Sequence, residues 1–181
     1  MSCIHDTSTP YRPETNGIAE RAVRRVKEGT SASLVQSGLP EDWWGEAMYF
    51  YCLLRCVYDQ LQDRKTAFEK RSGQPLKDPI SPFGAQIEYK PSRDKDIQKL
   101  HQLGKKMLSG IFLGYEQQAG GGWSGDLMVA DWQQIETAGL RSDIHINRFK
   151  AEEIEVVKRN DRHVFPITEG NLFCPRTQKR P

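Results

Sequence analysis

The sequence is poor in cysteine and histidine, which argues against a structural zinc site. Four cysteines and four histidines occur in 181 residues, and the histidines are scattered rather than placed beside the cysteines. Cys52 and Cys56 lie one helical turn apart among apolar residues, a pattern typical of buried free thiols. We therefore expect no structural metal in this chain.

The sequence also lacks a signal peptide and any apolar run of about 18 residues, the length that a membrane span requires. These absences predict a soluble intracellular protein, in the nucleus and cytoplasm, with no membrane partner. The net charge is only +2, so overall charge does not identify a nucleic-acid-binding protein. With 37% hydrophobic and 28% charged residues, the composition is that of a globular chain on the polar side, with room for one domain or two small ones.

The stretch from Pro10 to Arg21 is the one around which the chain is organised. Pro10 and Pro13 disfavour helix in the residues that precede them. Asn16 is a suitable N-cap, because its side-chain oxygen can accept hydrogen bonds from the free amides of a first helical turn. The sequence therefore predicts an extended loop that leads into a helix from about residue 18 to residue 36.

On a helical projection this segment separates into an apolar arc and a charged arc. The apolar arc holds Ile18, Ala19, Ala22, Val23 and Val26, and the charged arc holds Glu20, Arg21, Arg24, Arg25, Lys27 and Glu28. One interpretation is a solvated face on which Glu20 pairs with Arg24, an interaction worth about 0.3–0.5 kcal/mol. The other is a metal-binding carboxylate within a phosphate-binding basic surface. The charge pattern alone favours the first.

A wider set of motifs favours the second interpretation, a metal-binding carboxylate within a phosphate-binding surface. The chain reads His5, Ser8, Pro10-Tyr11-x-Pro13 and Asn16-Gly17-x-Ala19-Glu20-Arg21. This string resembles the end of the integrase core of retroelements, most closely that of copia-like LTR retrotransposons. Later landmarks of that family are matched in the same order: Leu39-Pro40-x-x-Trp43-Trp44-Gly45-Glu46-Ala47, Thr66-Ala67-Phe68-Glu69-Lys70-x-x-Gly73-Gln74-Pro75, Pro82-Phe83-Gly84 and Gly110-Ile111-Phe112-Leu113-Gly114-Tyr115. Together the landmarks cover about residues 5 to 150.

The resemblance implies that Glu20 is a catalytic residue and a metal ligand, the third acid of a D,D-35-E active site on a ribonuclease H-like fold. The cofactor would be Mg²⁺ or Mn²⁺, which prefer oxygen ligands, and the partners would be DNA and other integrase protomers. The residues expected to bind DNA are Tyr11, Arg12, Asn16, Arg21, Arg24, Arg25 and Lys27. Only 19 residues precede Glu20, so the family's two aspartates lie outside this chain. We therefore expect the chain alone to be inactive and to bind no metal tightly.

The predicted fold class is α+β: a helical C-terminal remnant of a ribonuclease H-like integrase core, followed by a small antiparallel SH3-like β-barrel. A largely buried helix is expected from Pro40 to about Tyr58, and a short helix from Thr66 to Ser72. Short apolar runs between glycine-rich turns predict the strands of the barrel, at Ala85–Tyr89, Lys106–Tyr115, Asp126–Asp131, Asp143–Phe149 and Glu155–Val157. The SH3-like assignment itself follows from the resemblance.

These elements predict four regions along the chain. They are residues 1–58 for the truncated catalytic core, 59–81 for a linker, 82–158 for the barrel domain and 159–181 for a polar basic tail.

Two other functions are compatible with the same residues. A non-catalytic nucleic-acid-binding or protein-interaction module derived from a retroelement would use the basic helix and the barrel without Glu20. Alternatively, the chain is a degenerate retroelement fragment with no cellular role.

Overall fold

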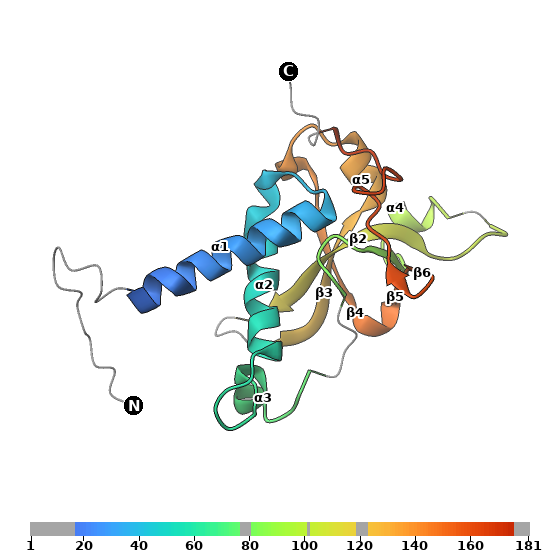
Figure 1. The fold of residues 1–181 in the computed structure, drawn as a ribbon. Coiled ribbons are helices and arrows are strands. Elements are labelled where there is room, and N and C mark those ends of the chain that lie inside the picture. The colour runs from blue at the N-terminus through green and yellow to red at the C-terminus, as the bar shows by residue number, and fades with distance from the viewer. Residues whose placement is uncertain (1–16, 77–80, 101, 119–122, 176–181) are drawn as a thin grey trace, which may run out of the picture.

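The computed structural model describes residues 17–76, 81–100, 102–118 and 123–175 (Figure 1). The helices are α1 (Gly17–Ser37), α2 (Trp44–Tyr58), α3 (Ala67–Ser72), α4 (Asp94–Ile97) and α5 (Trp132–Thr137), with short 3₁₀ turns η2 (Glu41–Trp43), η3 (Arg141–Asp143) and η4 (Ala151–Glu153). The strands are β1 (Gln86–Tyr89), β2 (Leu108–Gln117), β3 (Trp123–Asp131), β4 (Ile146–Lys150), β5 (Ile154–Val156), β6 (Lys158–Arg159) and β7 (Arg162–His163).

Helix α1 confirms the first predicted helix within one residue at each end. It stops at Gly38, whose φ of +71° is a left-handed conformation that glycine adopts without strain. Inside the helix, Gly29 allows close contact with α2, because a Cβ placed there would lie 2.1 Å from atoms of the Tyr51 ring. The predicted N-cap, Asn16, lies outside the described residues.

Helix α2 is buried along one face only. Ala47, Phe50 and Leu53 lie in the core at helical spacing, and Trp43, the last residue of η2, continues this buried face. On other faces, Trp44 and Tyr49 are each 60% exposed. The prediction of a largely buried helix is therefore wrong for these two aromatic residues, because α2 is covered by α1 on one side and by β2 on another and is left open elsewhere.

The two cysteines of α2 also differ from the prediction. Cys52 is half-buried and Cys56 is exposed, so the expected pair of buried thiols is not formed. Burial raises the pKa of the Cys52 thiol above its ordinary value, and the neighbouring Cys56 adds to that shift.

Helix α3 confirms the short helix predicted after the first two. Thr66 accepts a hydrogen bond from the amide of Glu69, and the Glu69 carboxylate accepts one from the amide of Thr66. This reciprocal pair is a capping box, which satisfies two amides at the start of a helix. Gly73, at φ +75°, closes the other end.

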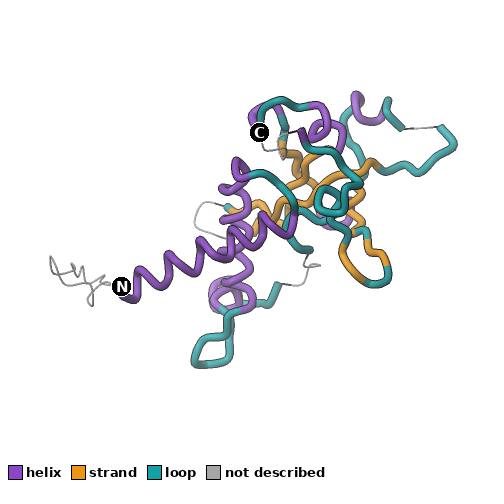
Figure 2. Tube along the Cα trace, turned by 45° about the horizontal axis from the view of Figure 1, so that its top comes forward, coloured by secondary structure: helices purple, strands orange, loops and turns teal. Residues whose placement is uncertain are grey.

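Strands β1 to β5 form one antiparallel sheet in the order β4-β3-β2-β1-β5. Figure 2 shows the strands in orange beside the helices in purple. All five predicted strands are present, with shifts of up to three residues at their ends, and the α+β class is confirmed. The sheet is open in the described part of the chain, since β4 and β5 are its two edges. The predicted closed barrel is therefore not observed: β5 has three residues and pairs with β1 rather than with β4.

The helices and the sheet share one hydrophobic core. The ring of Phe50 on α2 lies 5.8 Å from that of Phe83, 6.1 Å from that of Phe112 and 6.4 Å from that of Tyr115. Such aromatic contacts add about 0.5–1.5 kcal/mol per pair beyond area burial. The sheet therefore folds against α2, while the division into regions at residues 58 and 82 stays a prediction.

Residues 159–175, expected to begin a polar tail, return to the body of the protein. They contribute the buried side chains of Val164, Leu172 and Cys174. The amide of Gln86, at the start of β1, donates a hydrogen bond of 2.8 Å to the carbonyl of Val164. The remaining residues of the predicted tail, 176–181, lie outside the described residues.

Candidate nucleic-acid interface

The described members of the predicted site all lie on the N-terminal half of α1. Glu20, Arg21, Arg24, Arg25 and Lys27 are all exposed. Figures 1 and 2 show this half of the helix extending away from the rest of the described chain. The other predicted DNA-binding residues, Tyr11, Arg12 and Asn16, lie outside the described residues.

The apolar arc of α1 is covered only toward its C-terminal end. Thr30 and Ser37 are buried there, whereas Ile18 is 80% exposed and Val23 is 54% exposed. The arc that the sequence predicts to face a core therefore has no covering element over its first turns in the described part of the chain. An uncovered apolar stripe that continues a covered one is typical of a surface that binds further polypeptide.

Many cations in the rest of the described chain form ion pairs, whereas those of α1 do not. In the body, nine cationic side chains form ion pairs: Arg55, Lys70, Lys99, Lys105, Arg141, Arg148, Lys150, Lys158 and Arg159. On α1, Arg21 donates from Nε to the carbonyl oxygen of Gly17 at 3.1 Å. Within the described residues no ion pair joins an α1 cation to a carboxylate, and the weak Glu20–Arg24 pair considered from the sequence is not formed. Four positive charges therefore remain available on one exposed helix.

The described residues do not assemble a metal site around Glu20. They contain no group of three or more histidine, cysteine, aspartate or glutamate side chains close enough to hold an ion. A shallow concavity runs along the helix, lined by Ala19, Glu20, Val23, Arg24, Lys27 and Glu28. Two carboxylates mixed with cations are a poor fit to a two-metal site, which requires several acids around both ions.

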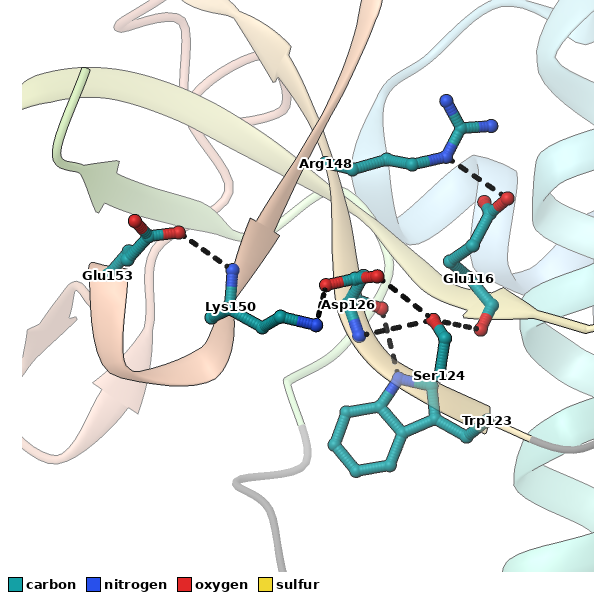
Figure 3. A network of polar contacts seen from close by, with 7 residues as sticks. All are labelled: Glu116, Trp123, Ser124, Asp126, Arg148, Lys150 and Glu153. Carbon is teal, nitrogen blue, oxygen red and sulfur yellow. Dashed lines mark hydrogen bonds and ion pairs between the residues drawn. The ribbon is translucent and has the colours of Figure 1, made fainter. Parts of the chain in front are cut away.

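A polar network at the edge of the sheet is a second candidate site (Figure 3). Asp126 on β3 forms an ion pair with Lys150 at 2.5 Å and accepts from Ser124 at 3.2 Å, while Arg148 pairs with Glu116 at 3.0 Å. The hydrogen bond from Lys150 is the main cause that lowers the pKa of Asp126. Asp126 and Glu116 each already have a cation, so their ion pairs join β2, β3 and β4 rather than forming a site for a ligand.

A buried tyrosine–aspartate pair is a third candidate. Tyr89 on β1 donates to Asp131 at 2.6 Å, and the other oxygen of Asp131 accepts from the amide of Gln134 at 3.1 Å. Burial, followed by the Asp131 hydrogen bond, raises the pKa of Tyr89 well above its ordinary value. Because Asp131 is also the N-cap of α5, the pair joins β1, β3 and α5 and has a structural role.

Sequence reasoning missed one cluster of basic side chains. Residues Lys158 to His163 form the hairpin of β6 and β7, with four basic side chains in six residues. The local run of basic residues is the signal that could have found it, but the sequence predicts only a polar basic tail from residue 159 onward.

None of the described helices has both the length and the apolarity needed to cross a membrane.

Comparison with known proteins identifies one stretch of similarity. A segment of 50 residues, 28% of this chain, is 38% identical to part of the retrovirus-related Pol polyprotein from transposon TNT 1-94 of Nicotiana tabacum. The matched segment covers 4% of that relative's length. No family model matches the chain, and no solved structure matches it. The similarity supports an origin in a retrotransposon Pol polyprotein.

Proposed function

We propose that this chain is the C-terminal part of a retrotransposon integrase and that α1 binds DNA. The observation that carries the proposal is the set of four exposed cations on α1 that have no carboxylate partner in the described residues. Free cations on one exposed helix are the arrangement that neutralises backbone phosphates and releases counterions. The partial match to a Pol polyprotein supports the same origin.

We further propose that the sheet is an SH3-like domain. Its first strand lies between the second and the fifth, and a 3₁₀ turn, η4, joins the fourth strand to the fifth. Five antiparallel strands in a single sheet support the assignment, although the sheet is open here.

Glu20 is proposed to be a metal ligand only in the intact parent protein. When bound there, Mg²⁺ or Mn²⁺ would activate the attacking oxygen and stabilise the leaving one. The two further acids would have to come from outside this chain, as would other integrase protomers. The chain alone is then a DNA-binding fragment that does not process DNA ends.

The proposal is tested by the affinity for a short labelled DNA duplex, measured by fluorescence anisotropy. Arg24→Gln with Arg25→Gln should weaken binding roughly tenfold or more at about 0.1 M salt, because two phosphate contacts and their released counterions are lost. Glu20→Gln should leave affinity unchanged or slightly higher, since it removes a negative charge beside the basic surface.

A matched control removes the same charge elsewhere. Lys65→Gln with Arg71→Gln changes two exposed cations near α3, away from α1, and should leave affinity close to that of the unchanged chain. Equal losses in the two double variants would show a response to net charge alone and would contradict the proposal.

A protein-interaction module is the second candidate function. The exposed Ile18 and Val23 on the apolar arc of α1 favour it. If DNA binding is absent but Ile18→Ser with Val23→Ser abolishes self-association or retention of an integrase partner, this second function replaces the first.

A further inference from the structure

The β6–β7 hairpin concentrates basic side chains far from α1. Its strands join through Asn160 and Asp161, both at positive φ (51° and 61°), as a tight two-residue hairpin turn requires. Figure 1 shows β6 on the opposite side of the molecule from the exposed half of α1. Any ligand that binds here therefore contacts a surface separate from the first.

The register of the hairpin places like charges opposite each other. Arg159 pairs with Arg162, and Lys158 pairs with His163. Residues directly opposite in an antiparallel pair project to the same side, and like charges in that position destabilise it. A two-stranded hairpin has little other stabilisation, so the Arg159–Arg162 pair opposes its folding unless negative charge lies nearby.

Negatively charged side chains in the described part of the chain compensate only part of this repulsion. Glu169 lies 3.7 Å from Arg159, and Asp161 lies 3.9 Å from Lys158, which are long distances between well-exposed partners of small effect. Arg162 forms no ion pair within the described residues. A shallow concavity beside the hairpin is lined by Arg159, Asn160, Arg162, His163, Val164 and Glu169.

We propose that the β6–β7 hairpin is a second nucleic-acid contact, which binds backbone phosphates through Arg159 and Arg162 independently of α1. A phosphate between these two guanidinium groups would turn their repulsion into two charge-assisted hydrogen bonds. Burial, and then Lys158, lowers the pKa of His163, so this imidazole is neutral near pH 7 and the two arginines with Lys158 carry the charge. Arginine fits this role because its planar fork matches phosphate oxygens.

The test compares binding of a short DNA duplex across a salt series for four proteins: the unchanged chain, the Arg159→Gln/Arg162→Gln variant, the Arg24→Gln/Arg25→Gln variant and the variant with all four changes. The hairpin variant should bind roughly tenfold more weakly at about 0.1 M salt, with a salt slope lower by about two. Because the surfaces are independent, the losses should multiply in the fourfold variant. The Lys65→Gln/Arg71→Gln protein is again the matched charge control.

A second readout locates the contact without a substitution. In NMR titrations with the same duplex, the ring resonances of His163 should shift, while those of His145, exposed on another part of the surface, should not. Unchanged affinity in the hairpin variant together with an unmoved His163 would overturn the inference, as would binding of phosphatidylserine vesicles by the hairpin without any response to DNA. If the hairpin variant loses affinity but the α1 variant does not, the inference holds and the proposed role of α1 fails.

Discussion

Replacing Trp43 by alanine is expected to lower the free energy of unfolding by about 3–5 kcal/mol, because a large side chain is removed from a filled core. Trp43 has no exposed surface, and the guanidinium carbon of Arg141 lies 3.9 Å from its ring centroid. Arg141 also pairs with Glu46 on α2. The substitution therefore opens a cavity and removes the aromatic ring that the Arg141 guanidinium contacts.

The adjacent Trp44 is the matched control for that change. Trp44 is 60% exposed, so Trp44→Ala should change the free energy of unfolding by no more than about 0.5 kcal/mol. Both values are measured from urea unfolding followed by circular dichroism, which does not depend on either indole as a probe. Equal losses for the two variants would contradict the assignment of α2's buried face.

Replacing Gly84 by alanine is the second large effect expected. Gly84 has φ +80°, and a Cβ placed there would lie 2.1 Å from the Cβ of the buried Ser37 at the end of α1. A left-handed conformation costs an alanine about 1–2 kcal/mol, and crowding against a fixed neighbour adds about 1–3 kcal/mol. We expect a loss of about 2–5 kcal/mol in the free energy of unfolding.

The same substitution at Gly73 distinguishes the conformational cost from the crowding cost. Gly73 has nearly the same φ, +75°, but nothing lies within 4 Å of its added Cβ. Gly73→Ala should therefore cost only the conformational part, about 1–2 kcal/mol. If Gly84→Ala costs no more than Gly73→Ala, the end of α1 is not packed against the start of the sheet.

The elements of this fold were predictable where the signals are local. The start of α3 follows from Thr66 and Glu69, whose capping box needs only two residues at the right spacing. The five strands of the sheet were found because each short apolar run is bounded by turn residues. Both kinds of signal act within a few residues, so they remain readable without knowing the rest of the fold.

Which face of each helix is buried was harder to predict, because burial depends on residues that are distant in the sequence. Ile18 and Trp44 have the composition of core residues but are exposed, since no described element packs over them. Conversely, Val164 and Leu172 lie in a polar stretch and are buried, because that stretch returns to the sheet. Hydrophobic pattern shows which residues can be buried, and the tertiary arrangement determines which ones are.

In the candidate site, too, some features have a local sequence signal and others depend on the tertiary structure. The basic side chains of α1 were assigned to DNA binding through the resemblance, because their charge pattern alone favoured a solvated face, and the structure leaves them exposed. The pairing of Arg159 with Arg162 was not predictable, because it depends on the register of a hairpin in a segment whose composition predicts a polar tail.

The most direct test of the account is the salt dependence of DNA binding for the unchanged chain and for Arg24→Glu with Arg25→Glu. Each neutralised phosphate contributes about −0.9 to the slope of log affinity against log salt. If α1 binds the DNA backbone, the charge-reversed variant should bind far more weakly, and its slope should be shallower by about two. A slope that is the same in both proteins would show that α1 does not contact phosphates and would contradict the proposed function.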